Sequence, residues 1–139
     1  MGDQLYLVME KLHTMKNYLE ELEAIGQLSF EEYQKDSWKR YAIERLIQLI
    51  VDLAVDINNL ILTYLKQPAS KDYYNTFIEM GEAGVLPVDF AVSMAPCTGM
   101  RNRLVHQYES IEPEIIYHAI PKTIEGFKKY MKYINHYVR

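Results

Sequence analysis

The stretch that decides the fold is SWKRYAIERLIQLIVDLAVDINNLILTYLKQ, residues 37–67. Its apolar side chains recur at steps of three and four residues, which is the spacing of one face of an α-helix. Pro68 follows directly, and proline disfavours the helical conformation of the residue before it. We therefore expect one long helix whose apolar stripe faces a core. The stripe consists of Ile43, Leu46, Ile50, Leu53, Ile57, Leu60 and Tyr64.

A second helical stripe precedes this segment. The N-terminal helix should end at Gly26, because glycine is common just beyond a helix C-terminus. Ser29 and Glu32 have the spacing of a capping box, which marks the start of a helix. A break is expected near Asp36 and Ser37, before the long helix begins. The N-terminal stripe consists of Leu5, Val8, Leu12, Met15, Leu19 and Leu22.

Three more helices are expected after the long one. A short helix should cover Ser70–Glu82, with its first residue as the N-cap. Pro87 suits the first turn of the next helix, where no amide donor is needed, and Pro96 and Gly99 should kink or break that helix. The last helix should begin near Pro113. The two later stripes are Phe90, Met94, Cys97 and Leu104, and then Ile116, Ile120, Thr123, Phe127, Tyr130, Ile134 and Tyr137.

These helices should form one domain over residues 1–139, because a chain of 139 residues fits a single domain. The chain has six glycines and five prolines, so few residues interrupt secondary structure. This favours long helices over many short strands. The connections are short, so neighbouring helices should be antiparallel. The sequence therefore predicts an all-α, antiparallel up-and-down helical bundle of about five helices.

Charge and composition limit the functions open to the protein. The net charge of −4 argues against a large electrostatic footprint for duplex nucleic acid, although a small basic pocket is still compatible with it. The lone cysteine, Cys97, cannot form an internal disulfide and has no zinc-binding spacing around it. The N-terminus lacks the apolar core of a signal peptide, and no run of about 18 apolar residues is present. We expect a cytoplasmic protein with no membrane segment.

The polar groups best suited to chemistry lie in GMRNRLVHQY, residues 99–108. On a helix, at about 100° per residue, Asn102 and His106 share one face, while Arg101 and Tyr108 share a neighbouring stripe. Arg101 and His106 are roughly 140° apart around the axis. They would converge only if a kink re-aims the arginine, or if two chains meet at a dimer interface.

This set of side chains suits phosphate chemistry. Histidine moves protons near neutral pH, and a guanidinium is a fixed cation whose fork matches phosphate oxygens. Together, Arg101 and His106 could bind a phosphodiester, activate a ribose hydroxyl or protonate a leaving group, and stabilise the developing charge, with Asn102 orienting the histidine. None of this requires a metal. The structural alternative is that these side chains satisfy the last carbonyls of a helix.

In this setting, Arg101-Asn102-x-x-x-His106-x-Tyr108 resembles the Arg-x4-His-x-Tyr motif of the HepT-like HEPN proteins, in which asparagine commonly follows the arginine. The similarity extends over about residues 1–138. A departure is Asn58-Asn59-Leu60, where the family pattern would place alanine, asparagine and histidine. The other similar segments are Tyr41–Gln48 and Val55–Ile57 in the long helix, Glu82–Pro87 before the motif and Ile111–Tyr117 after it.

The resemblance implies a bundle that forms a homodimer, with two motifs meeting in a cleft to make a metal-independent RNA-cleaving site without a cofactor. Arg101 would stabilise the phosphate charge, His106 would act as acid or base, and Asn102 would position them. The implied role is the toxin of a type VII-like toxin–antitoxin pair. Its implied partners are RNA and an MntA-like minimal nucleotidyltransferase antitoxin, which attaches AMP to the motif tyrosine, here Tyr108. The bulk and negative charge of the nucleotide would keep an RNA phosphate from Arg101.

A second group of polar residues, Arg45, Asp52, Asp56 and Asn59, runs along one side of the long helix. These residues form either a solvated face or the polar edge of the cleft. In the second case Asp56 is the first choice for a supporting residue, with Arg45 as another. Three functions stay open: the ribonuclease toxin, a non-catalytic HEPN subunit that binds nucleotide or RNA with a nucleotidyltransferase, and a purely structural bundle.

Overall fold

The computed structural model describes residues 2–67 and 72–139, and all regular secondary structure within them is helical. The predicted all-α class is therefore confirmed. The described residues form more helices than the five expected, because the two predicted interruptions are complete helix boundaries. The helices are α1 (Gly2–Ile25), α2 (Phe30–Lys35), α3 (Ser37–Tyr64), α4 (Tyr73–Glu82), α5 (Val88–Met94), α6 (Cys97–His106), the 3₁₀ helix η1 (Tyr108–Ser110) and α7 (Pro113–Val138).

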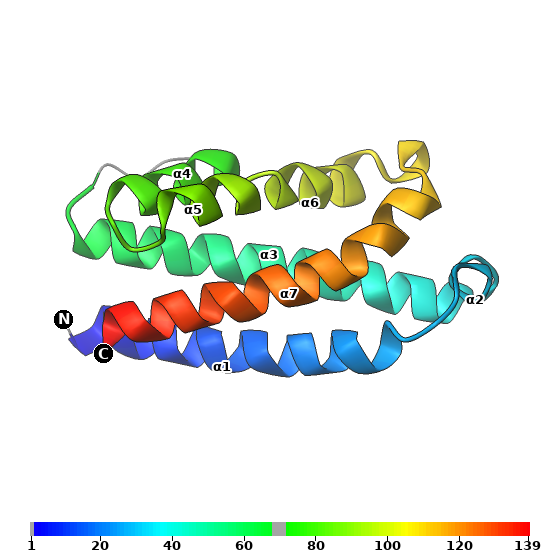
Figure 1. Cartoon of the computed structure of the whole chain (residues 1–139), viewed down its shortest axis with the longest axis horizontal. Coiled ribbons are helices and arrows are strands. Elements are labelled where there is room, and N and C mark those ends of the chain that lie inside the picture. The colour runs from blue at the N-terminus through cyan, green and yellow to red at the C-terminus, as the bar shows by residue number, and fades with distance from the viewer. Residues whose placement is uncertain (1, 68–71) are drawn as a thin grey trace.

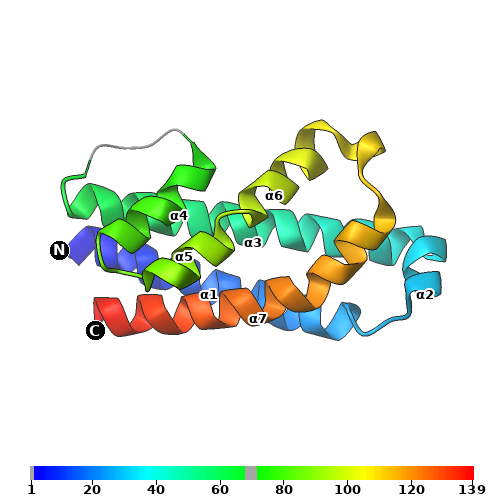
Figure 2. The same cartoon turned by 45° about the horizontal axis from the view of Figure 1, so that its top comes forward.

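The helices form an antiparallel bundle around α3 (Figures 1 and 2). Helices α1 and α7 pack against α3 and against each other, while α4 and α6 also contact α3. Helices α5 and α6 follow one another and together make the third leg of an up-and-down arrangement, and α4 folds back beside α5. The start of α1 and the end of α7 lie at the same end of the bundle (Figure 1). The predicted topology is thus confirmed, with its third leg broken into short helices.

The first helix boundaries follow from local chemistry, as the sequence indicates. Helix α1 ends before Gly26, where a Cβ atom would lie only 2.6 Å from the Leu22 carbonyl oxygen and 2.8 Å from Ile120 Cγ2 of α7. Glycine therefore allows α1 and α7 to approach closely at this point. Ser29 caps α2 through its hydroxyl, which accepts a hydrogen bond from the Glu32 amide.

Helices α2 and α3 meet at a single residue, Asp36. Its amide donates to the Glu32 carbonyl to close α2, and its carboxylate accepts from the Lys39 amide to start α3. An aspartate at such a junction satisfies one orphan group of each helix. The predicted break near Asp36 is therefore confirmed as a full boundary.

The far end of α3 differs in detail from the expectation. Helix α3 ends at Tyr64, and Lys66 adopts a positive φ of 59°. The predicted terminator Pro68 and the predicted cap Ser70 lie outside the described residues. Helix α4 begins at Tyr73, and its N-cap is Asp72, whose side chain accepts a hydrogen bond from the Tyr74 amide.

The predicted interruption before the polar segment falls at Pro96. Helix α5 ends at Met94 and α6 begins at Cys97, with Pro96 as its N-cap. Proline has no amide hydrogen, so the helical hydrogen-bond ladder cannot continue through it. Directly after it, the Thr98 amide donates to the Ala95 carbonyl three residues back, at 3.2 Å, which is the pattern of a 3₁₀ turn. After this break α6 continues from α5 toward the end of the bundle where α2 lies, and it is inclined to α3 in the view of Figure 2.

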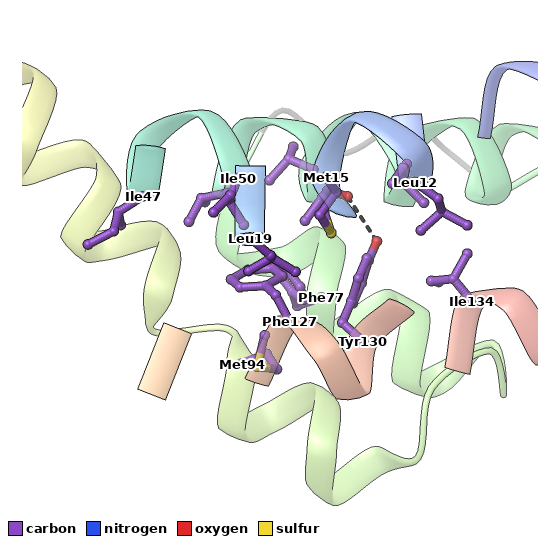
Figure 3. Close-up of a cluster of buried hydrophobic side chains, with 14 of the residues drawn as sticks. Leu12, Met15, Leu19, Ile47, Ile50, Phe77, Met94, Phe127, Tyr130 and Ile134 are labelled. Carbon is purple, nitrogen blue, oxygen red and sulfur yellow. Dashed lines mark hydrogen bonds between the residues drawn. The ribbon is translucent and has the colours of Figure 1, made fainter. Parts of the chain in front are cut away.

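The core fills the space between α3 and the other helices (Figure 3). The predicted stripes are buried along most of their length, but their last residues, Tyr64 and Tyr137, are exposed. The buried face of α3 is wider than one stripe, because helices contact it from several sides. The buried residues of α3 are Ile43, Leu46, Ile47, Ile50, Val51, Ala54, Val55, Ile57, Asn58, Ile61 and Leu62.

One polar network crosses this core. The Tyr130 hydroxyl of α7 donates to Asn58 Oδ1 at 2.6 Å and lies 3.1 Å from the Ala54 carbonyl oxygen. The Asn58 amide donates to the Thr76 hydroxyl of α4, 3.1 Å away. All three side chains are buried. Because buried polar groups need partners, these bonds fix the register of α3 against α4 and α7.

Helix α3 is also long and apolar enough to cross a membrane by length and composition alone. Half of its most apolar window is buried inside the bundle. Its hydropathy is that of a central helix which neighbours cover on several sides, so burial within the protein accounts for it.

Candidate functional site

The polar segment 101–108 lies on α6 and the turn that follows it. Helix α6 ends at His106, Gln107 leaves the helical conformation with φ −135° and ψ 39°, and Tyr108 opens the 3₁₀ helix η1. The expectation that Arg101 and Tyr108 share one helical stripe is therefore wrong. The helix ends between them, and each side chain contacts a different part of α3.

Arg101 is anchored on α3 by a carboxylate. Its Nε donates to Asp52 Oδ1 at 2.6 Å, and its NH2 lies 3.5 Å from the other oxygen. Only 16% of the Arg101 side chain and 29% of the Asp52 side chain are exposed. The guanidinium carbon also lies 5.0 Å above the ring of Tyr73 on α4, at the distance of a cation–π contact.

Asn102 assists Arg101 and not His106. Its Oδ1 accepts a hydrogen bond from Arg101 NH1 at 3.2 Å. The His106 side chain is exposed at the end of α6 and makes no hydrogen bond or ion pair within the part of the chain that the structure describes. The structure therefore shows a contact between Asn102 and Arg101. His106 lies on the same face of α6 as Asn102, as predicted, but its side chain has no hydrogen bond to either residue.

Tyr108 has a separate partner, Glu44 of α3. The Tyr108 hydroxyl donates to Glu44 Oε1 at 2.8 Å, and the hydroxyl of Tyr33 from α2 donates to Glu44 Oε2 at 3.0 Å. Tyr33 is fully buried, whereas 42% of Tyr108 is exposed. Glu44 therefore links a fixed core tyrosine to an accessible one.

A cavity of about 440 Å³ opens beside these groups, with Arg40, Glu44 and Tyr108 in its lining. Burial, then Glu44, raises the pKa of Tyr108, and the Arg40 guanidinium partly opposes this increase. Burial and the Glu44 carboxylate also raise the pKa of Tyr33 well above its usual range. Both phenols therefore stay protonated at neutral pH.

The supporting residues expected on α3 lie elsewhere. Asp56 faces Lys11 of α1, with Nζ and Oδ2 3.5 Å apart and 57% of the Asp56 side chain exposed. Arg45 is exposed, and Asn59 is half-buried. Asp52, one turn before Asp56, is the residue that contacts Arg101. The role predicted for Asp56 thus has no contact with the motif behind it, whereas Asp52 has one.

The sequence patterns did not identify three residues of this site, Glu44, Arg40 and Tyr33. Tyr108 and Glu44 are 64 positions apart, so no local spacing connects them. A metal would need several His, Cys, Asp or Glu side chains close together, and within residues 2–67 and 72–139 no three of them are so grouped.

The sequence is similar to a known protein family and to a characterised relative. Residues 15–134 match the family model described as Ribonuclease HepT-like. A tRNA nuclease HepT of Aphanizomenon flos-aquae (strain 2012/KM1/D3) is 34% identical over 132 residues, covering 95% of this chain and 90% of that protein.

Solved structures share the fold at low sequence identity. A tri-AMPylated Shewanella oneidensis HEPN toxin, in complex with an MNT antitoxin, has a TM-score of 0.86 at 17% identity and covers 98% of this chain and 99% of that one. A toxin–antitoxin MntA-HpeT mutant has a TM-score of 0.84 at 15% identity over 94% and 98% of the two chains.

The bundle, with its polar segment laid along a central helix, is a HEPN fold. The family match and the 34% identical relative cover most of the sequence. The chain belongs to the ribonuclease HepT-like family.

Proposed function

We propose that this protein is a metal-independent, tRNA-cleaving endoribonuclease toxin of a type VII toxin–antitoxin pair, acting in the cytoplasm as a homodimer. An MntA-like nucleotidyltransferase neutralises it by adding AMP to Tyr108. The observation that carries the proposal is the anchored Arg101, held by Asp52 and Asn102 on the segment that also presents His106.

Arg101 is built to bind a phosphate in a fixed orientation. Asp52 accepts the hydrogen bond from the Nε–H of Arg101, so the guanidinium is oriented before any substrate binds. An arginine held by a neighbouring carboxylate loses little conformational freedom when it binds an anion. In the proposed reaction its remaining N–H groups neutralise the charge that develops on the scissile phosphate.

His106 supplies the proton transfer. A ribose 2′-hydroxyl attacks the phosphorus, the bond to the 5′-oxygen breaks, and imidazole groups remove the first proton and deliver one to the leaving oxygen. The exposure of His106 at the end of α6 leaves it accessible to an RNA strand. This chemistry needs no metal and leaves a 2′,3′-cyclic phosphate.

The separation of Arg101 and His106 supports a site made by two chains. The Arg101 guanidinium is bound to Asp52 of α3, whereas the exposed His106 side chain has no hydrogen bond to Arg101 within the described residues. A second copy that packs its α6 against the first would bring a histidine of one chain to the arginine of the other. We therefore include the homodimer in the proposal.

Neutralisation by AMP rests on the accessible hydroxyl of Tyr108. The solved Shewanella toxin is AMPylated and bound to an MNT antitoxin, and Tyr108 is the exposed tyrosine of the motif in this chain. A nucleotide attached there adds negative charge and bulk near the end of α6, which would keep an RNA phosphate out of the site.

The test is cleavage of purified tRNA, with EDTA present, by wild type, Arg101→Ala and His106→Ala. We expect each variant to cut at least about 10²-fold more slowly, the usual scale for lost acid–base or electrostatic catalysis. Arg103→Ala, on the same helix, is the matched control and should keep most of the activity. Wild-type rates from His106→Ala would refute the ribonuclease proposal.

The net charge of −4 and the split motif also fit a second function, a non-catalytic HEPN subunit that binds nucleotide or RNA with a nucleotidyltransferase. It predicts no tRNA cleavage by wild type and harmless expression in a bacterial host. Growth arrest by wild type that disappears in His106→Ala would exclude it.

A further inference from the structure

Glu44 has a position that the ribonuclease reaction does not explain. It lies on α3, eight residues before the partner of Arg101, and among the described residues its hydrogen bond from the motif comes from Tyr108. Each of its carboxylate oxygens accepts one phenolic hydroxyl, from Tyr33 at 3.0 Å and from Tyr108 at 2.8 Å. The Tyr108 hydroxyl proton is therefore already hydrogen-bonded to a carboxylate that could accept it.

The surroundings keep Glu44 in place and its second partner accessible. Tyr33 is fully buried and packs on Tyr117 of α7, with the ring centroids 5.8 Å apart, so it is a rigid anchor. The cavity beside Tyr108 is lined by Arg40 as well as Glu44. A phosphate that approaches the Tyr108 oxygen from this cavity would meet the Arg40 cation and the Glu44 carboxylate in the same lining.

From this geometry we propose that Glu44 is the general base for the modification of Tyr108, so that the acceptor protein itself supplies the base. The inference rests on the proposed function, in which Tyr108 receives AMP from ATP bound to the nucleotidyltransferase. The Tyr108 oxygen attacks the α-phosphorus, the bond between that phosphorus and the pyrophosphate oxygen breaks, and pyrophosphate leaves. The phenolic proton passes to Glu44, which returns it to solvent.

The chemistry gives this base a clear task. A neutral phenol is a weak nucleophile, and a positioned base activates it. Burial and the Glu44 carboxylate raise the pKa of Tyr108, so little phenolate forms at neutral pH without an acceptor for the proton. Arg40 lies on the same cavity and suits the negative charge of the incoming phosphate.

A purely structural role for Glu44 would look different in experiment. Glu44→Gln keeps the length of the side chain and one oxygen that accepts from Tyr108, but it cannot take up a proton at neutral pH. Glu109→Gln is the matched control, because Glu109 lines the same cavity without a hydrogen bond to Tyr108.

The experiment is the rate of AMP addition, followed by intact mass, with the MntA-like partner and ATP. We expect Glu44→Gln to be modified about 10²-fold more slowly than wild type, Glu109→Gln to match wild type, and Tyr108→Phe to remain unmodified. The rate of Glu44→Gln should rise about tenfold per pH unit as hydroxide replaces the base, whereas the wild-type rate should be flat above neutral pH. Glu44→Asp should recover part of the rate if Glu44→Gln proves unstable.

The outcomes distinguish a failure of Glu44 as the base from a failure of AMP addition itself. Equal rates for wild type and Glu44→Gln, with Tyr108 modified in both, would overturn the role of Glu44 and leave the proposed function intact. No modification of wild-type Tyr108 would overturn the neutralisation step and the role of Glu44 with it. A slow Glu44→Gln rate that does not respond to pH would show that Glu44 only positions the tyrosine.

Discussion

Removing the carboxylate that holds Arg101 is the most direct test of the site. Asp52→Ala deletes the hydrogen bond at 2.6 Å and leaves a guanidinium with 16% exposure without its partner. Exposed ion pairs contribute about 0.2–1 kcal/mol, and breaking a fully buried pair costs about 3–5 kcal/mol. The second contact, at 3.5 Å, adds little, and both side chains keep some solvent access. We therefore expect a loss of about 1–2 kcal/mol, or roughly 3–8 °C in Tm.

Urea unfolding followed by circular dichroism measures this loss. Asp56→Ala is the control on the same helix, because the Asp56 side chain is 57% exposed and its ion pair with Lys11 is 3.5 Å long. This substitution should change the free energy of unfolding by less than about 0.5 kcal/mol. In the Arg101→Ala background, Asp52→Ala should cost much less than in wild type, since the partner is already absent. Equal losses for Asp52→Ala and Asp56→Ala, or no coupling in this cycle, would refute the view that Asp52 holds the arginine.

The remaining predictions concern the dimer, the core and the tyrosines. Mixed dimers of Arg101→Ala and His106→Ala chains should recover a substantial part of tRNA cleavage that neither variant has alone, and no recovery would argue against a shared site. Tyr130→Phe should lower the free energy of unfolding by about 1–3 kcal/mol, because Asn58 Oδ1 loses its buried donor; a change below about 0.5 kcal/mol in urea unfolding would contradict this. Stability should fall as pH rises above about 10, because unfolded tyrosines ionise there while the raised pKa keeps folded Tyr33 neutral. This stability is complete below pH 10, and Tyr33→Phe should show a shallower fall in alkaline unfolding than wild type.

Much of the fold follows from local signals in the sequence. Gly26, Ser29, Asp36 and Pro96 act on residues within a turn of themselves, and each lies at a helix boundary in the structure. The stripes gave the core-facing side of each long helix. The width of the buried face on α3 could not be predicted in this way, since it depends on how many helices pack around it.

The site was predicted less completely, for a physical reason. The motif residues are close in sequence, but their partners are not: Asp52 is 49 positions from Arg101, and Glu44 is 64 from Tyr108. Asp52 and Asp56 lie four residues apart and thus on one side of α3. Only the axial position of α6 along α3 decides which of them reaches the arginine, and no sequence pattern in one chain reports that position. The position of Tyr108 could not be predicted either, because α6 ends at His106 and the tyrosine leaves the helical stripe that it was expected to share with Arg101.

Two carboxylates of α3 bind the two ends of the motif, so the spacing between them has to match the length of the motif. Glu44 and Asp52 are eight residues apart, about 12 Å along a helix. The segment from Arg101 to Tyr108 runs antiparallel to α3, with Arg101 at Asp52 and Tyr108 at Glu44. The length of the motif is thus set by a second sequence far upstream, and an inserted residue in either would detach one end. In this chain the acidic pair Glu-x7-Asp of the long helix is thus the counterpart of the Arg-x6-Tyr spacing of the motif, because it holds the arginine and the tyrosine in one register.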